Sequence, residues 1–219
     1  MTEQLDNLLR ETRTFPPSAE FAAQANVGVE AFDAARADRI GFWEEQARRL
    51  RWRTPWTQAL EWERPYAKWF VGGQLNVAEN CLDRHVEAGL GDRVAIHWIG
   101  EPADDTRDIT YAQLLDEVKR AANALAALGV QAGDRVAIYL PMLPETVVAM
   151  LACARLGAAH SLIFGGFSAQ AIHDRVTDAD ARVVITSDGG YRRGAPSPLK
   201  AHVDEAIAKG GTSIEHVLV

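Results

Sequence analysis

The stretch of sequence that decides the fold is residues 135–164, which read RVAIYLPMLPETVVAMLACARLGAAHSLIF. Arg135–Tyr139 and Ala159–Phe164 are apolar runs with the length of buried strands, and Pro144–Leu156 between them has the length of a helix. A strand, a helix and a second strand in this order predict a βαβ unit, in which both strands lie parallel in one sheet.

The same alternation continues on both sides of this unit. Further strands are expected at Arg93–Ile99, Arg182–Thr186 and Ile214–Val219, and further helices at Thr110–Leu128, Ser168–Thr177 and Pro198–Ala208. Thr110–Leu128 has apolar residues at spacings of three and four, and Gly129 follows as a C-cap. We therefore predict an α/β fold with a largely parallel sheet flanked by helices on both faces.

The hexamer GDRVAI occurs twice, at Gly91–Ile96 and at Gly133–Ile138. In each copy Gly-Asp is expected to form a turn and Val-Ala-Ile to enter a strand. We interpret the repeat as one local solution used twice. Gene duplication is the alternative, and it is less favoured because the flanking residues do not match.

The part of the chain before residue 93 has a different character. Residues 1–37 are rich in alanine and interrupted by Pro16 and Pro17, which predicts a mobile or loosely docked N-terminal arm. Residues 38–92 are predicted to form a Trp-rich N-terminal layer, with tryptophans at positions 43, 52, 56, 62 and 69. Packing of these rings is favoured over a stacking platform for nucleic-acid bases, which usually carries net positive charge.

Composition narrows the classes of function. The 30 Asp and Glu residues outnumber the 23 Lys and Arg residues, and a net charge of −7 argues against nucleic acid or an anionic membrane as a general partner. Cys81 and Cys153 are expected to be reduced thiols. The sequence shows neither the apolar core of a secretory signal nor a run near the roughly 20 apolar residues of a membrane span, so we expect a cytoplasmic protein.

The chain stops directly after the predicted strand Ile214–Val219. Natural domains rarely end on a bare buried strand, so we expect the chain to be a fragment of a longer protein. The α/β domain of residues 93–219 is therefore predicted to be truncated.

Common self-sufficient active-site motifs are missing from the sequence. There is no GxxxxGK[ST] phosphate loop and no GxGxxG, and residues 166–170, GFSAQ, lack the closing glycine of a nucleophile elbow. Cys81 and His85 lie one helical turn apart, a spacing that zinc ligands use, but no second pair accompanies them. We therefore interpret Cys81 as a core residue beside a partly exposed histidine, and we predict no metal site.

Three segments carry more information than any of these motifs. Residues 76–83 read NVAENCLD, residues 139–167 read YLPMLPETVVAMLACARLGAAHSLIFGGF, and residues 182–200 read RVVITSDGGYRRGAPSPLK. Together with the Trp-rich front they resemble the short-chain acyl-CoA synthetases of the adenylate-forming superfamily, above all the acetyl-CoA synthetases. The resemblance is nearly collinear from residue 42 to residue 219.

This resemblance implies a two-step reaction for the full-length parent. ATP and acetate give acetyl-adenylate and pyrophosphate with the help of Mg²⁺, and the thiol of coenzyme A (CoA) then forms acetyl-CoA and releases AMP. It also implies that residues 93–219 are part of an AMP-binding-type domain. Relatives that activate propionate or acetoacetate are the nearest alternative.

The resemblance places a CoA-binding basic motif at Arg192, Arg193, Gly194 and Ala195. Arg192 matches the family's first basic position, whereas Ala195 stands where a second basic residue is common, so Arg193 is the candidate to compensate. The plain alternative is a solvated charged loop.

Gly165 and Gly166 follow a predicted strand, and by resemblance they lie near the path of CoA. The alternative for these two glycines is a tight turn before a helix that is capped by Ser168.

The family's phosphate loop, its acyl-pocket residues and its catalytic lysine come later in the chain. The resemblance therefore implies that none of these 219 residues is catalytic, that the isolated chain is inactive, and that CoA is the only ligand to touch it. Expected partners are acetate, ATP, CoA and the remainder of the same chain. The alternatives are a stand-alone CoA-binding module without chemistry and an interaction domain whose Trp-rich layer docks a partner.

Overall fold

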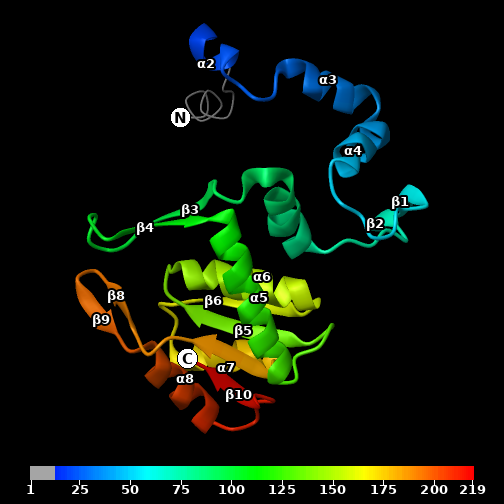
Figure 1. Cartoon of the computed structure of the whole chain (residues 1–219). Coiled ribbons are helices and arrows are strands. Elements are labelled where there is room, and N and C mark those ends of the chain that lie inside the picture. Colours follow the sequence, from blue (N-terminus) through cyan, green and yellow to red (C-terminus); the bar gives the residue numbers. More distant parts are fainter. Residues whose placement is uncertain (1–12) are drawn as a thin grey trace, which may run out of the picture. The chain divides into compact units, whose positions relative to one another are not determined.

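The computed structural model describes residues 13–219, and the chain divides into two compact units whose elements are labelled in Figure 1. The first unit comprises residues up to 49 together with 58–71, and the second comprises residues 50–57 and 72–219. The first twelve residues of the predicted arm lie outside the described residues. The division into an arm, a Trp-rich layer and an α/β domain at residues 37 and 92 stays a prediction.

The first unit consists of short helices and one hairpin. Its elements are α2 (Ala19–Ala23), α3 (Val29–Ala37), α4 (Arg39–Arg48), β1 (Gln58–Glu63) and β2 (Tyr66–Val71), with β1 and β2 antiparallel. The side chains of Ser18 and Asp38 cap α2 and α4 by accepting hydrogen bonds from backbone N–H groups. Among the described residues of this unit, only Ala47 and Ala59 are buried, so it has little core of its own.

The tryptophans of residues 38–92 make local ring contacts. Trp43 packs edge-on against Phe42 with ring centroids 5.4 Å apart, and Trp52 packs against Trp56 at 5.0 Å. Such offset and edge-on arrangements are the favoured geometry of aromatic pairs. The Trp-rich layer predicted from the sequence is present as this set of aromatic contacts.

The second unit is built on a parallel four-stranded sheet. Its strands are β5 (Arg135–Leu140), β6 (Ala159–Phe164), β7 (Val183–Thr186) and β10 (His216–Leu218), in the order β10-β7-β5-β6. Every neighbouring pair is parallel, and Val136 of the central strand lies level with His160 and with Val183. The predicted parallel sheet is therefore confirmed for the strands that follow residue 134.

Helices cover both faces of this sheet, as predicted. They are α5 (Tyr111–Ala127), α6 (Pro144–Leu156), α7 (Ala169–Asp178) and α8 (Leu199–Ala208). Val136 and Ile138 are fully buried against α5 and α6, whereas Ala137 and Tyr139 are fully buried against α7 and α8. Because successive side chains of a strand point to opposite faces, β5 contributes to both halves of the core.

Sequence signals at the helix ends have the expected geometry. Thr110 and Gln113 form a reciprocal capping box at the start of α5. Gly129 follows the end of α5 with a φ of 84°, a left-handed conformation that glycine adopts without steric cost. Ser168 caps α7 by accepting a hydrogen bond from the N–H of Ala171.

The strand predicted at Arg93–Ile99 exists, but its expected place in the parallel sheet is wrong. It is β3 (Val94–Ile99), and it pairs antiparallel with β4 (Thr106–Thr110) in a separate two-stranded sheet. Six residues join the two strands, and so short a link permits local antiparallel pairing, whereas parallel pairing needs a long crossover. The strand β4 was not predicted from the sequence. Two further strands of the second unit, β8 (Gly190–Arg192) and β9 (Ala195–Ser197), were not predicted either.

The two copies of GDRVAI start strands in different surroundings. Gly133–Ile138 leads into the central strand β5, whereas Gly91–Ile96 leads into the hairpin strand β3. Gly133 has a φ of 89°, while Gly91 is in the right-handed helical region at −57°. The hexamer thus fixes the start of a strand, and the surrounding chain decides its partner.

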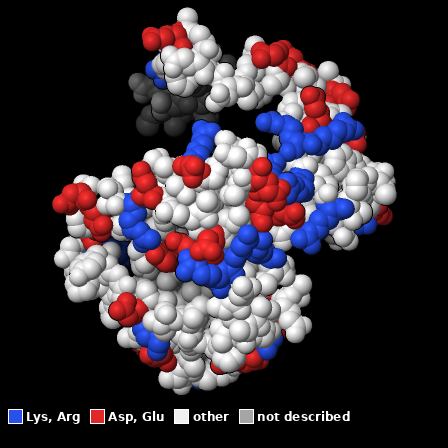
Figure 2. Space-filling model, viewed as in Figure 1, with Lys and Arg blue, Asp and Glu red and all other residues white. Residues whose placement is uncertain are grey.

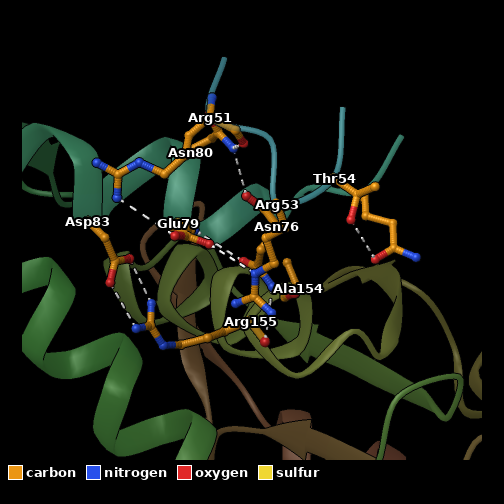
Figure 3. Close-up of polar contacts among 10 residues, drawn as sticks. Arg51, Arg53, Thr54, Asn76, Glu79, Asn80, Asp83, Ala154 and Arg155 are labelled. Atoms are coloured by element: carbon orange, nitrogen blue, oxygen red, sulfur yellow. Dashed lines mark hydrogen bonds and ion pairs between the residues drawn. The ribbon is translucent and has the colours of Figure 1, made fainter. Parts of the chain in front are cut away.

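A polar anchor fastens residues 51–54 and the segment 76–83 to the end of α6 (Figure 3). The segment contains η1 (Glu79–Asp83), a short π-helical turn that is followed by η2 (Val86–Leu90). Asn76 Nδ2 donates to the carbonyl oxygens of Ala154 and Arg155, each at 3.1 Å. These carbonyls belong to the last turn of α6, where carbonyl groups lack the regular N–H donor four residues on. The Ala154 carbonyl oxygen also accepts a hydrogen bond from the N–H of the capping residue Gly157, at 3.2 Å.

Asn80 and Asp83 complete the polar anchor. Asn80 Oδ1 accepts a hydrogen bond from the N–H of Arg51 at 2.8 Å, and its Nδ2 donates to the carbonyl oxygen of Arg51 at 2.9 Å and to that of Asn76 at 3.0 Å. Asp83 receives two hydrogen bonds from the guanidinium group of Arg155, at 2.8 and 2.9 Å. The motif NVAENCLD, which contributes to the family resemblance, therefore has a structural role in this chain.

Candidate functional site

A cleft of about 1050 Å³ lies in the second unit at the carboxyl ends of the central strands. We call it the sheet-edge cleft. Its walls come from four segments, and the residues used below are Trp98, Glu101, Pro141, Asp188, Arg192 and Arg193. Its lining residues follow the ends of β5 and β7 or belong to the hairpins β3–β4 and β8–β9, and these hairpins are labelled in Figure 1. Parallel sheets commonly bind ligands at this edge.

Arg192 and Arg193 lie at the tip of the hairpin β8–β9 rather than on an irregular loop. Arg193 and Gly194 form its two-residue turn with φ angles of 55° and 75°, and two successive positive values are typical of a type I′ turn. Arg192 is paired with Ala195 across the hairpin. The small side chain of Ala195 leaves Arg192 without a bulky neighbour on that face of the hairpin.

The Arg192 side chain stacks on the loop that contains the glycine pair. Its Cζ atom lies 5.1 Å from the centroid of the Phe164 ring, within range of a cation–π contact. A side chain on Gly166 would collide with the Arg192 guanidinium and with the Phe164 ring. The fold thus brings together the two segments that the resemblance selected. Arg192 and Arg193 line the cleft, and Gly166 lies behind Arg192.

Gly165 has a different role from Gly166. A Cβ atom at Gly165 would approach the carbonyl oxygen of Leu140 to 3.1 Å, so the turn packs tightly on the end of β5. Tyr139 supports the same turn from the core, because its hydroxyl lies 3.2 Å from the carbonyl oxygen of Gly165 and 3.0 Å from that of Phe167. Burial raises the pKa of Tyr139, so the phenol keeps its proton and donates it. Sequence reasoning missed Tyr139, whose only signal was a hydroxyl at the end of a buried strand.

The cleft carries both signs of charge. Arg192 and Arg193 share it with Glu101 and Asp188, and neither arginine has an ion-pair partner within residues 13–219. Glu101 Oε1 accepts a hydrogen bond from the N–H of Gly194 at 2.7 Å. Sequence reasoning missed Glu101, because 93 positions separate it from Gly194.

Basic and acidic side chains lie interspersed on the face of the molecule seen in Figure 2. Arg192 and Arg193 are neighbours at the tip of the β8–β9 hairpin, so their positive charge in the cleft is a local feature of that tip. A local pair of guanidinium groups suits a compact anion such as a phosphate, which it binds through forked N–H donors.

The cysteines and histidines form no metal centre in the part of the chain that the structure describes, where no group of three His, Cys, Asp or Glu side chains is placed to hold a metal ion. Both thiols are free, as predicted. The interpretation of Cys81 as a core residue is wrong, because Cys81 is exposed on η1. Cys153 is buried on α6, and burial raises the pKa of its thiol to about 11, which keeps it protonated and unreactive.

The sheet, the flanking helices and the cleft at the strand ends agree with the match to known families. The chain belongs to the AMP-binding enzyme family, which matches residues 82–218. The family described as acetyl-coenzyme A synthetase N-terminus matches residues 29–81.

Individual relatives sharpen this assignment. The chain is 66% identical over 218 residues to an acetyl-coenzyme A synthetase of Streptomyces avermitilis, which covers 99% of this chain and 33% of the relative. It is 62% identical over 208 residues to one of Mycobacterium bovis (94% of this chain, 32% of the relative) and 50% identical over 221 residues to one of Deinococcus radiodurans (99% and 34%). The chain thus spans about a third of the length of these curated relatives.

Proposed function

We propose that the chain is the N-terminal third of an acetyl-CoA synthetase, an enzyme that joins acetate to CoA at the expense of ATP. The observation that carries the proposal is 66% identity over 218 residues to a protein of that name. The whole protein would convert acetate and ATP to acetyl-adenylate and pyrophosphate, and would then form acetyl-CoA and AMP. We propose acetate rather than propionate or acetoacetate as the acid, because the relatives reported above carry the name acetyl-coenzyme A synthetase.

Within that enzyme this chain would bind the nucleotide end of CoA. The residues present fit an anionic nucleotide, because Arg192 and Arg193 line a cleft large enough for one and pair with no carboxylate among residues 13–219. Arg192 would hold a phosphate through its guanidinium fork, and the Phe164 ring beneath it would fix the plane of that fork. Ala195 stands where a second basic residue is common in the family, and Arg193 would supply that second positive charge instead.

CoA supplies the thiol that accepts the acetyl group, and the residues of this chain would act on its position. The β8–β9 hairpin presents both arginines at the cleft, and Gly166 leaves room for Arg192 over the Phe164 ring. Fixing the nucleotide in this way converts part of the binding energy into orientation of the distant reactive end.

Within residues 13–219, no group of three His, Cys, Asp or Glu side chains comes together that could hold Mg²⁺. No step through Mg²⁺ or through the phosphates of ATP is therefore assigned to this chain. We place those steps on the remainder of the whole protein, and acetate, ATP and CoA are its proposed partners.

We place the whole protein in the cytoplasm. The proposal is supported by the two free thiols, which are typical of a reducing compartment. Among residues 13–219, no helix combines the length and the apolar character that crossing a membrane requires.

Replacing Arg192 by alanine in the whole enzyme is expected to affect the second half-reaction alone. The KM for CoA should rise about tenfold or more, because a charge-assisted hydrogen bond to a phosphate is lost. The rate of acetate-dependent exchange between ATP and pyrophosphate, measured without CoA, should stay within about twofold.

The matched control is Arg120→Ala, which removes an exposed guanidinium of α5 that pairs with Asp116. It should leave both half-reactions unchanged. The 219-residue chain alone, given all three substrates, should release no pyrophosphate. Pyrophosphate exchange that falls with Arg192→Ala as strongly as thioester formation would contradict the proposed role of the hairpin.

A further inference from the structure

Two hairpins that are distant in the sequence are joined at their tips. Glu101 follows β3, Gly194 lies in the turn between β8 and β9, and the carboxylate oxygen accepts the N–H of Gly194 at 2.7 Å. Figure 1 shows the two hairpins side by side at the end of the sheet. Because Glu101, Arg192 and Arg193 all line the sheet-edge cleft, this hydrogen bond connects two of its walls.

The hairpin itself leaves the N–H of Gly194 without a partner inside the β8–β9 ladder. The last pair of the β8–β9 ladder is Arg192 with Ala195, so the two turn residues between them lie outside the ladder. In a type I′ turn the N–H of the second central residue takes no part in closing the turn. The tip therefore concentrates two guanidinium groups and one backbone donor, and Glu101 is the anion bound there.

We propose that Glu101 is a positioning residue that latches the β8–β9 hairpin, and that a phosphate group of the ligand competes with its carboxylate for the hairpin tip. This inference rests on the proposed binding of CoA at the same cleft. A carboxylate and a phosphate carry like charges, and both are attracted by the same arginines. Their repulsion at close range in a solvated cleft corresponds to about three- to tenfold in affinity.

Two substitutions separate the hydrogen bond of Glu101 from its charge. Glu101→Gln keeps an oxygen acceptor for the N–H of Gly194 and removes the negative charge. Glu101→Ala removes both. The matched control is Asp104→Asn, which makes the same change of net charge in the same β3–β4 turn at a residue outside the cleft lining.

The latch is tested in the unliganded chain by hydrogen exchange of the amides in residues 189–197. With Glu101→Ala these amides are expected to exchange at least about fivefold faster than in the wild type. With Glu101→Gln and with Asp104→Asn they should exchange at the wild-type rate. Unchanged exchange in the Glu101→Ala variant would overturn the latch, and this readout does not depend on CoA.

The competition is tested by calorimetric titration with CoA, with 3′-dephospho-CoA and with inorganic phosphate. Glu101→Gln should lower the Kd for CoA about three- to tenfold and change that for 3′-dephospho-CoA less than about twofold. If Glu101→Gln also binds inorganic phosphate more tightly, the competition is supported, and the phosphate group alone competes with the Glu101 carboxylate without the rest of the nucleotide. An unchanged or raised Kd for CoA in Glu101→Gln would overturn the competition.

The two proposals fail in distinguishable ways. If neither wild type nor Glu101→Gln binds CoA, both the proposed CoA site and the proposed competition are refuted. The hydrogen-exchange rates then still test whether Glu101 holds the β8–β9 hairpin. If wild type binds CoA and the Glu101 variants match it in every readout, the CoA site stands and the role of Glu101 is refuted.

Discussion

Replacing Asp83 by alanine is expected to lower the free energy of unfolding by about 3 kcal/mol, because the substitution leaves the Arg155 guanidinium without its bidentate partner. The side chains of Asp83 and Arg155 are 16% and 27% exposed, so the pair is largely shielded from water. Removing one member of such a partly buried pair is costly because the remaining charge stays partly desolvated. Urea denaturation of the 219-residue chain measures the change.

The control is an aspartate–arginine pair on the exposed face of α5. Asp116 and Arg120 lie 3.0 Å apart with 68% and 70% of their side chains exposed, and Asp116→Ala should cost less than about 0.5 kcal/mol. The double variant Asp83→Ala/Arg155→Ala should be more stable than the sum of the two single changes predicts. Equal costs for Asp83→Ala and Asp116→Ala would contradict the role assigned to the pair.

The same ion pair predicts a pH dependence. The hydrogen bonds from Arg155 hold the pKa of Asp83 below its ordinary value. A carboxylate with a lowered pKa in the folded state contributes stability that is fully present above its unfolded pKa of about 3.9. That contribution is lost as the pH falls through the lowered pKa, so the difference between wild type and Asp83→Ala should be constant near neutrality and should shrink below about pH 4.

Replacing Asn80 by alanine is expected to lower the free energy of unfolding by about 3 kcal/mol. Asn80 is buried, and its side chain makes three hydrogen bonds, two to the backbone of Arg51 and one to the carbonyl oxygen of Asn76. Alanine leaves the N–H and the carbonyl group of Arg51 without these partners, and each unsatisfied buried group costs about 1–3 kcal/mol. Urea denaturation again measures the effect.

The exposed Asn123 of α5 supplies the matched control. Asn123→Ala makes the same chemical change on a solvent face and should alter the free energy of unfolding by less than about 0.5 kcal/mol. Limited proteolysis should also cleave the Asn80→Ala variant faster near residues 50–57, which Asn80 holds to η1. A loss of stability no larger than that of Asn123→Ala would show that the polar anchor contributes little.

The parallel sheet could be predicted because its strands and helices alternate in the sequence with clear lengths. After Arg135, residues 136–139 are apolar on both faces and fully buried, and only a strand covered by helices on both sides buries every residue of such a run. The error at Arg93–Ile99 has a local cause. The same hexamer starts β3 and β5, and the choice between a hairpin and a parallel partner depends on residues 100–110 rather than on the strand itself.

The candidate site was predictable only in part. Arg192 and Gly166 were selected through the family resemblance, and the fold places them against each other. The hairpin that carries Arg192 was not predicted, because its strands are three residues long and Arg193 adopts a positive φ that sequence patterns assign to glycine or asparagine. The contact of Glu101 with Gly194 depends on tertiary structure alone and leaves no signal in spacing.

The motif at residues 76–83 was likewise predictable only in part. Its family likeness was visible in the sequence, but the reason for its residue types was not. Asn80 and Asp83 meet their partners at Arg51 and Arg155, which lie 29 and 72 positions away. Side chains with such distant partners gain their role only when α6 and residues 51–54 are brought together by the fold.

The central claim is that the tip of the β8–β9 hairpin binds the phosphates of CoA, and calorimetric titration of CoA into the 219-residue chain tests it most directly. Wild type should bind with a measurable Kd, Arg192→Ala should bind with a Kd about tenfold or more higher, and Arg120→Ala should have the wild-type value. Equal affinities for wild type and Arg192→Ala, or no heat of binding from wild type at millimolar CoA, would contradict it.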